Sequence, residues 1–154
     1  MGPDLAKVMQ ELTSRMRHLK AMQEDKASAG NLTERDLLIL DLLNENGKMA
    51  VSQISVADPT ASESTISTTI TKLWRDKKMV TKTINPENQR TTIVELTDKG
   101  KKAIEVYNKQ RDERFKTLFD AINVTEPEKE VMTKVLSRAI TFFDKHLDIS
   151  NNGK

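Results

Sequence analysis

The sequence predicts a mainly α-helical fold with one small antiparallel β-hairpin, which places the chain in the α+β class. Apolar residues recur at three- and four-residue steps over most of its length, which is the period of amphipathic helices. Two runs rich in β-branched residues, 79–84 and 90–96, flank a turn with proline and asparagine, and they predict the hairpin. Because the chain has no cysteine, disulfides, thiolate nucleophiles and cysteine-ligated zinc are excluded, and a reducing, cytoplasmic compartment is expected.

Six helices are expected from the apolar period and from the residues that begin and end helices. Thr33 is a hydroxyl N-cap followed by an acidic first turn, and Gly47 is a typical residue just past a helix end. Asp58-Pro59 closes a short helix, because proline disfavours the helical conformation in the residue before it. The expected helices cover about residues 4–26, 33–46, 51–57, 61–77, 99–122 and 125–147.

This order of elements is that of a helix-turn-helix followed by a β wing, with further helices at both ends. Apolar residues also repeat along both terminal segments, for example Leu5, Leu12 and Leu19 at heptad spacing. A winged lobe of about seventy residues has too little surface to cover them all, so a second copy of the chain is the simplest cover. The expected division is an N-terminal dimerisation helix (1–30), a winged helix-turn-helix lobe (31–100), C-terminal dimerisation helices (101–148) and a frayed tail (149–154).

Charge is distributed unevenly along the chain. The formal net charge is only +2, which by itself does not indicate nucleic acid. Residues 72–90 hold six basic and two acidic residues, a net +4, so the remainder is net −2. A local basic segment on a slightly acidic body is the pattern expected of a surface that docks on phosphate.

The fourth expected helix combines a narrow apolar stripe with a face of hydroxyl residues. At 100° per residue, Ile66, Ile70 and Leu73 fall on one side of the helix. The segment from Ser62 to Thr71 holds seven serine and threonine residues, each of which costs roughly a few tenths of a kcal/mol of helix stability. Small hydrogen-bonding side chains suit the DNA major groove. The alternative is an indifferent solvent-facing surface, which ordinarily carries stronger helix formers.

Several short motifs lie between residue 32 and about residue 102. They are Leu32-Thr33, Ser64-Thr65-Ile66-Ser67, Ile70-Thr71-Lys72-Leu73 and Met79-Val80-Thr81-Lys82, and most specifically Asn85-Pro86-Glu87-Asn88-Gln89-Arg90 and Val94-Glu95-Leu96-Thr97-Asp98-Lys99-Gly100. With these motifs the segment resembles the MarR family of transcription regulators. The resemblance implies a homodimer whose first and last helices interleave and whose two winged lobes bind a pseudo-palindromic site on double-stranded DNA. It also implies a repressor that releases DNA when a small, often phenolic, effector binds.

The resemblance further implies which residues contact DNA. Ser64, Thr65, Thr68 and Lys72 would meet the major groove, and Arg90 would enter the minor groove from the wing. The full expected DNA-binding set is Ser62, Ser64, Thr65, Thr68, Thr69, Lys72, Lys82, Gln89 and Arg90.

Two positions depart from the family pattern. Asn88 stands where an aspartate usually orients the wing arginine, so Arg90 is expected to be held less firmly. Lys78 replaces the glycine that is usual before the first wing strand. It must therefore adopt an unfavourable backbone angle, or the end of the helix must shift. Neither change removes the fold.

Other functions find little support in the residues. His18 and His146 lack the short spacing of zinc ligands, and neither a nucleophile elbow nor a glycine-rich phosphate loop is present. No enzyme activity, metal or cofactor is therefore expected, and neither a secretory signal nor a membrane-spanning run is found. The rival function is a protein-interaction module whose basic segment docks an acidic protein partner.

Two residue types leave alternatives open. The seven methionines could line an adaptable effector pocket, although methionine in a helix stripe is more often core or dimer seam. Trp74 is expected to pack beside the apolar stripe of its helix rather than to stack on a base.

Overall fold

The computed structural model describes residues 4–26 and 32–147, apart from the side chains of residues 21–26 and of Gln89. The predicted frayed tail, 149–154, lies outside these residues. The chain divides into two compact units, residues 1–32 and 33–154, and each is described by itself. The first contains the helix α1 (Leu5–Lys26), on which the predicted heptad residues Leu5, Leu12 and Leu19 are exposed.

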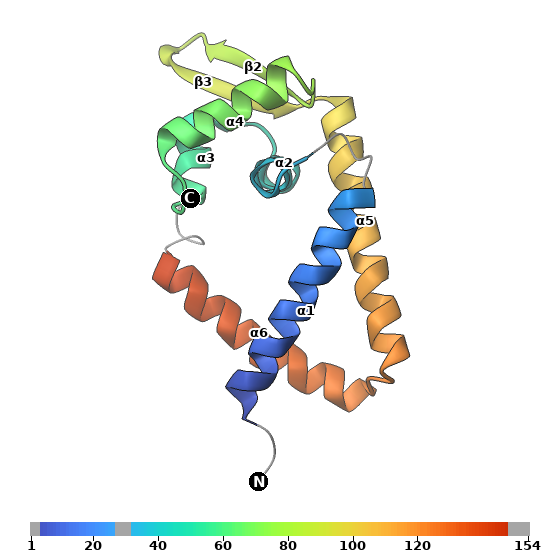
Figure 1. Ribbon diagram of the computed structural model, residues 1–154. Helices are drawn as coiled ribbons and strands as arrows, with labels where there is room; N and C mark the ends of the chain where they lie inside the picture. Colours follow the sequence, from blue (N-terminus) through green and yellow to red (C-terminus); the bar gives the residue numbers. More distant parts are fainter. Residues whose placement is uncertain (1–3, 27–31, 148–154) are drawn as a thin grey trace. The chain divides into compact units, whose positions relative to one another are not determined.

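The second unit contains the remaining helices and a small sheet (Figure 1). Every predicted helix and the predicted hairpin are present in the described residues, although the fourth helix ends at Arg75 rather than near residue 77. None of the described helices is long and apolar enough to cross a membrane. The elements are α2 (Glu34–Asn46), β1 (Met49–Ala50), α3 (Val51–Ala57), α4 (Glu63–Arg75), β2 (Val80–Asn85), β3 (Asn88–Leu96), α5 (Asp98–Ala121) and α6 (Glu126–Leu147).

The sheet has three strands, so the prediction of a hairpin alone was incomplete. β1 pairs antiparallel with β3, with Met49 opposite Val94 and Ala50 opposite Ile93, and the strand order is β1-β3-β2. Two residues are too few to display the alternation by which a strand is recognised in a sequence. The same segment starts α3, because the Ala50 N–H donates to Gln53 Oε1 at 2.8 Å.

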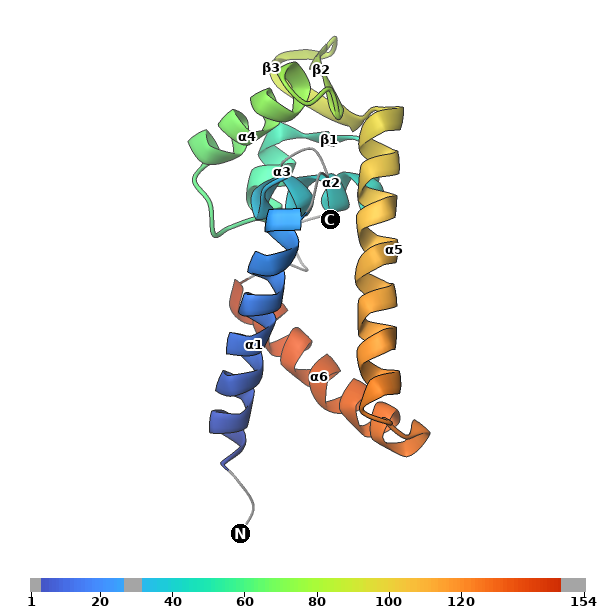
Figure 2. The same cartoon turned by 45° about the vertical axis from the view of Figure 1, so that its right-hand side comes forward.

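One apolar core holds α2, α3, α4 and the sheet together. Ile66, Ile70 and Leu73 of α4 are completely buried, which confirms the predicted stripe. α5 starts against this lobe and then runs away from it (Figure 2). α6 has no buried residue. The buried apolar residues among those described are Ile39, Leu40, Leu43, Met49, Ala50, Ile54, Ile66, Ile70, Leu73, Met79, Val80, Val94 and Ile104.

The chain turns sharply between α4 and β2. Lys78 has a left-handed φ of 58°, the first of the two alternatives that the sequence predicted for it. The Met79 N–H donates to the Leu73 carbonyl at 2.9 Å, and the Thr97 hydroxyl donates to the Lys78 carbonyl at 2.8 Å. Gly100, in the first turn of α5, touches the same turn, because a Cβ atom there would lie 2.0 Å from the Met79 oxygen. Glycine therefore lets α5 start directly against the connection that leads into the wing.

Replacing Gly100 with alanine should lower the free energy of unfolding by about 1 to 3 kcal/mol, because the new methyl group meets a backbone oxygen. In an unobstructed helix the same change stabilises the protein by up to about 1 kcal/mol. Chemical denaturation of Gly100→Ala measures the sign, and Lys101→Ala at the exposed neighbouring position is the control. A stabilised Gly100→Ala variant would contradict the close approach.

Candidate nucleic-acid interface

α4 begins with a side-chain cap. The Ser62 hydroxyl oxygen accepts from the Thr65 N–H at 3.1 Å, and the Ser62 and Thr65 hydroxyls share a hydrogen bond of 2.8 Å. Such a cap contributes about 1 kcal/mol to helix stability. Ser62, one of the predicted DNA-binding residues, therefore also fixes the first turn of the helix.

The face of α4 opposite its buried stripe is exposed and carries hydroxyl groups and two cations, Lys72 and Arg75. Ser64, Thr65, Thr68 and Lys72 are exposed, and Thr69 is partly exposed. Thr68 and Thr69 each donate their hydroxyl hydrogen to the carbonyl four residues earlier, at 2.9 Å. These bonds fix the rotamers of both side chains while the hydroxyl oxygens can still accept a hydrogen bond from a ligand. The residues predicted to meet the major groove thus share one surface.

The wing turns within two residues, Pro86 and Glu87, between β2 and β3. The side-chain oxygen of Asn85 accepts from the Glu87 N–H at 3.0 Å, and that of Asn88 accepts from the Arg90 N–H at 3.1 Å. Asn88 therefore holds the backbone of Arg90. In the described part of the chain, the exposed Arg90 guanidinium has no hydrogen-bond or ion-pair partner, so it is free to meet a ligand. The side chain of Gln89, also predicted to bind DNA, lies outside the described residues.

Lys82 of β2 couples the wing to α4. Its Nζ donates to the Thr71 hydroxyl at 3.3 Å and lies 5.2 Å from the ring centroid of Trp74. The guanidinium of Arg75 lies 5.7 Å from the same ring. Cations over an aromatic face are attracted by its quadrupole. Trp74, which is 39% exposed, therefore contacts the wing. The Lys82 ammonium has two partners on α4, the Thr71 hydroxyl and the Trp74 ring.

A polar cleft of about 370 Å³ opens between α3, α4 and the wing. It brings Lys82 and Arg90 together with hydroxyl groups that the sequence analysis did not single out. Strand alternation alone could not find them, because the cleft takes residues from two helices and both wing strands, whose packing is not encoded in any local pattern. The added lining residues are Val51, Ser52, Glu63, Ser67, Ile70, Thr91 and Thr92.

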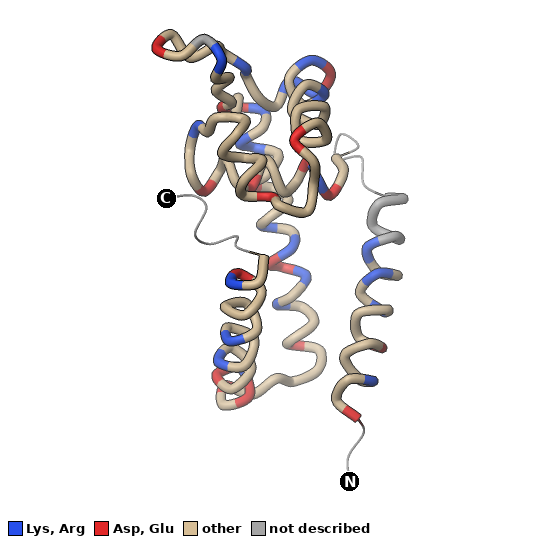
Figure 3. Tube along the Cα trace, turned by 90° about the vertical axis from the view of Figure 1, so that its left-hand side faces the viewer, with Lys and Arg blue, Asp and Glu red and all other residues tan. Residues whose placement is uncertain are grey.

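Basic positions concentrate where α4 ends and in the wing strands (Figure 3). Lys77 is paired with Asp36 of α2, whereas Lys72 and Lys78 are exposed. The predicted basic segment therefore contributes both to the surface and to the internal structure of the lobe.

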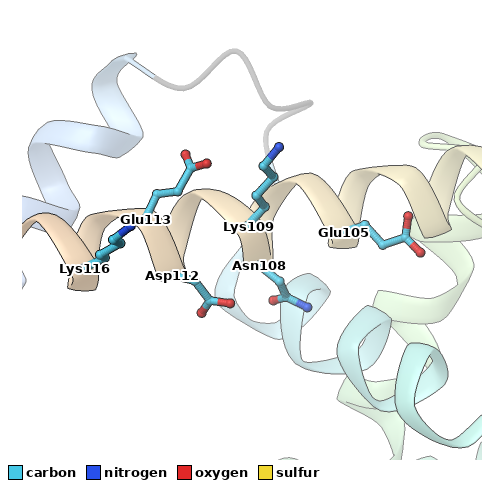
Figure 4. Close-up of a pocket in the computed structure, with 6 residues that line it drawn as sticks. All are labelled: Glu105, Asn108, Lys109, Asp112, Glu113 and Lys116. Carbon is cyan, nitrogen blue, oxygen red and sulfur yellow. The ribbon is translucent and has the colours of Figure 1, made fainter. Parts of the chain in front are cut away.

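A second hollow follows α5, and Figure 4 shows its six side chains. Acidic and basic groups alternate along it, and Asn108 is tied to α2 because its Nδ2 donates to Asp41 Oδ1 at 3.1 Å. Nothing in this hollow selects one charge. Among the described residues, no group of three or more histidine, aspartate and glutamate side chains could hold a metal ion. His146 stacks on Phe142 with ring centroids 4.1 Å apart.

Comparison with known proteins identifies the fold. No family model matches the sequence. The uncharacterized HTH-type transcriptional regulator YdgJ of Bacillus subtilis is 34% identical over 67 residues, which are 44% of this chain and 40% of that protein. The matched segment thus spans less than half of the curated relative.

Solved structures match over nearly the whole chain. A MarR protein from Peptoclostridium difficile has a TM-score of 0.73 at 20% identity and covers 96% of this chain and 94% of its own. Streptococcus pneumoniae FabT, solved in complex with DNA, has a TM-score of 0.77 at 19% identity and covers 92% and 99%. The chain has the fold of the MarR family. NadR in complex with 4-hydroxyphenylacetate is also similar, with a TM-score of 0.60 at 20% identity and coverage of 91% and 93%.

In this MarR-fold lobe, the turn that leads into α4 is fixed by a buried carboxylate. Asp58 is paired with Arg35 of α2 and accepts from the Thr60 hydroxyl at 2.6 Å. Burial alone would raise the pKa of Asp58, but the hydrogen bonds from Thr60 and Arg35 and the attraction of the guanidinium outweigh it. The pKa of Asp58 is therefore lowered below its ordinary value.

A lowered pKa of Asp58 predicts a contribution to stability that is complete above its ordinary pKa and is lost as the pH falls through the lowered value. We expect the free energy of unfolding to fall in this acid range. It should fall less steeply in Asp58→Asn, which has no carboxyl to protonate. Urea titrations at a series of pH values measure the slope, and Asp98→Asn, an exposed acidic residue, is the control. Parallel acid limbs for wild type and Asp58→Asn would refute the assignment.

Proposed function

We propose that this protein is a MarR-family transcription regulator. In the proposal it binds a pseudo-palindromic site on double-stranded DNA as a homodimer, represses its targets and is released by a small-molecule effector in the cytoplasm. The single observation that carries the proposal is the exposed hydroxyl face of α4, with Thr68 at its centre, beside a wing whose Arg90 guanidinium has no partner among the described residues. The sequence relative, an HTH-type regulator, and the DNA complex of a similar structure support it.

The two surfaces suit two adjacent grooves. A helix fits the major groove, where Thr68 and its neighbours would reach base edges, and a wing arginine suits a narrow minor groove. The strand of DNA between the two grooves would then pass over the cleft between α4 and the wing. There it would meet the Ser67 and Thr92 hydroxyls and the Lys82 ammonium. Phosphate contacts of this kind fix the register of a protein on DNA and leave base discrimination to the helix.

The homodimer is supported by apolar surface that a single chain leaves uncovered. No residue of α6 is buried, and Val131, Ile140 and Phe143 are 60%, 59% and 57% exposed. Contiguous apolar patches of this kind are rare on monomers and mark interfaces. In the proposal, residues 1–30 and 101–148 form the dimer base and residues 31–100 the DNA-binding lobe.

The effector is proposed to be a small aromatic acid. The support is that NadR, a protein of similar fold, is solved in complex with 4-hydroxyphenylacetate, which is a small aromatic acid. The chain has no cysteine, so release by thiol oxidation is excluded, and a small-molecule effector or methionine-based sensing remains.

Thr68→Ala and Arg90→Ala should each weaken binding by about 1 to 3 kcal/mol, roughly 5- to 150-fold, because each removes a groove contact. The probe is a duplex that the wild-type protein selects from a random pool. Fluorescence anisotropy over a salt series gives the affinities, and Arg90→Ala should also reduce the salt slope by about one if it neutralises a phosphate.

The matched control is Thr141→Ala. Thr141 donates to the Ser137 carbonyl at 3.0 Å, as Thr68 does to Ser64, but it lies on α6. Its removal should leave binding unchanged. Equal affinities for the wild type and all three variants would refute the site, and a wild-type protein that selects no duplex would refute the function.

A charge within the apolar face of α6 should dissociate the dimer. We expect Ile140→Glu and Phe143→Glu to shift the protein from dimer to monomer in sedimentation equilibrium, because a buried unpaired carboxylate is strongly unfavourable. Thr141→Glu adds the same charge on the opposite side of the helix, at 100° per residue, and should remain dimeric. A monomeric wild type would contradict the proposed assembly.

A further inference from the structure

Two adjacent residues at the start of α2 hold both ends of α4. Arg35 is paired with Asp58, in the turn that precedes α4. Asp36 is paired with Lys77, two residues after α4 ends, at 2.5 Å. We call these four residues the α2 anchor. α4 is therefore attached, through the segment before it and the segment after it, to a single turn of α2.

The anchor is the place where the described residues bury charge. Asp36 and Asp58 are 3% and 7% exposed, and they are the two buried charged residues in the described part of the chain. Burying a carboxylate is costly unless it is paired and hydrogen-bonded. An apolar pair of similar size would hold two helices together at least as well. Ion pairs add what apolar contacts lack, a fixed geometry between two defined atoms.

Further hydrogen bonds make each carboxylate rigid. Asp36 accepts from the Thr33 N–H at 2.9 Å, and its own N–H donates to the Thr33 hydroxyl at 3.1 Å, which forms a capping box on α2. Asp58 accepts from the Thr60 hydroxyl at 2.6 Å. Neither acceptor can turn away without breaking a second interaction, so the positions of Arg35 and Lys77 are defined as well.

The anchor also restricts the wing. Lys77 lies directly before Lys78, whose backbone is left-handed, and β2 begins two residues later, at Val80. A shift of Lys77 relative to α2 would move both the end of α4 and the start of the wing. The Asn108 to Asp41 hydrogen bond joins α2 to α5 in turn. α2 is thus the element through which a change at α5 could reach the recognition surface.

We propose that Arg35 and Asp36 are positioning residues that set the orientation of α4 and thereby the selectivity of DNA binding, without contacting DNA. The inference rests on the proposed function. Loss of one anchor pair should leave the general attraction for phosphate intact and reduce the preference for the selected duplex, because selectivity depends on the placement of base-reading side chains.

The test compares Lys77→Met with Lys78→Met. Both variants remove one positive charge from the same segment, but only Lys77 is in the anchor. The wild type and both variants are titrated with the duplex selected by the wild type and with a scrambled duplex of equal composition, at a temperature where circular dichroism shows them folded. Lys77→Met should lose about tenfold or more of the ratio between the two affinities. Lys78→Met should weaken both affinities equally, as expected for one lost phosphate contact.

Two further measurements separate orientation from simple stability. Amide hydrogen exchange over residues 63–75 should be faster in Lys77→Met and in Arg35→Met than in the wild type, and unchanged in Lys78→Met. The double variant Asp36→Asn/Lys77→Met should lose less selectivity than the sum of the losses in the two single variants, because the two residues are in direct contact.

The outcomes distinguish a failure of the α2 anchor from a failure of the proposed function. An unchanged affinity ratio in Lys77→Met, or an equal loss of that ratio in Lys78→Met, would overturn the anchor and leave the proposed function standing. A wild-type protein that does not distinguish the two duplexes would refute the proposed function. In that case the exchange of the α4 amides still decides whether the anchor holds the helix.

Discussion

The burial of one side of α4 is the constraint on which the rest of the lobe depends. Ile66, Ile70 and Leu73 are completely buried, and together they fix the rotation of the helix about its own axis. Once that rotation is set, the threonine and serine side must face solvent. The packing energy of a few apolar residues therefore determines where the polar surface points, and each such residue contributes about 1.5 to 3 kcal/mol when fully buried.

Around this helix the chain departs from locally favoured choices. A threonine-rich helix is weaker than one built from alanine or glutamate, Lys78 holds a backbone angle that favours glycine, and Arg90 is a cation without a described partner. Such departures commonly gather at functional surfaces, where stability is sacrificed to binding. Here they gather at one end of the lobe, which is the part that the α2 anchor holds in place.

Most helices, the wing and the exposed face of α4 could be predicted from the sequence, because they depend on residues that are close together in the chain. The apolar stripe of α4, the Thr33 cap and the strain at Lys78 are each properties of a few consecutive residues, so periodicity and backbone preferences reveal them. The α2 anchor is different, because Asp36 and Lys77 are 41 residues apart. Nothing in either neighbourhood distinguishes a residue that will form a buried pair from one that will remain solvated. The same holds for β1, whose two residues become a strand only because β3 offers a free edge.

Ser52 and Ser67 in the cleft were missed for a related reason. Neither was assigned to the predicted site, because each is one of several polar residues of its segment, and they line one cleft only after α3 and α4 have packed and the wing has folded over them. Local patterns define elements, whereas sites between elements require their packing.

The uncovered face of α6 has a consequence for the amount of protein. Under the proposed dimer, a second copy supplies the partner surface that the 22 residues of α6 do not find within their own chain. By mass action, the free energy by which the partner chain stabilises α6 then increases with the logarithm of the chain concentration. A cell that makes few copies would keep a larger share as separate chains, so the rate of synthesis itself would set how much of the protein is dimeric.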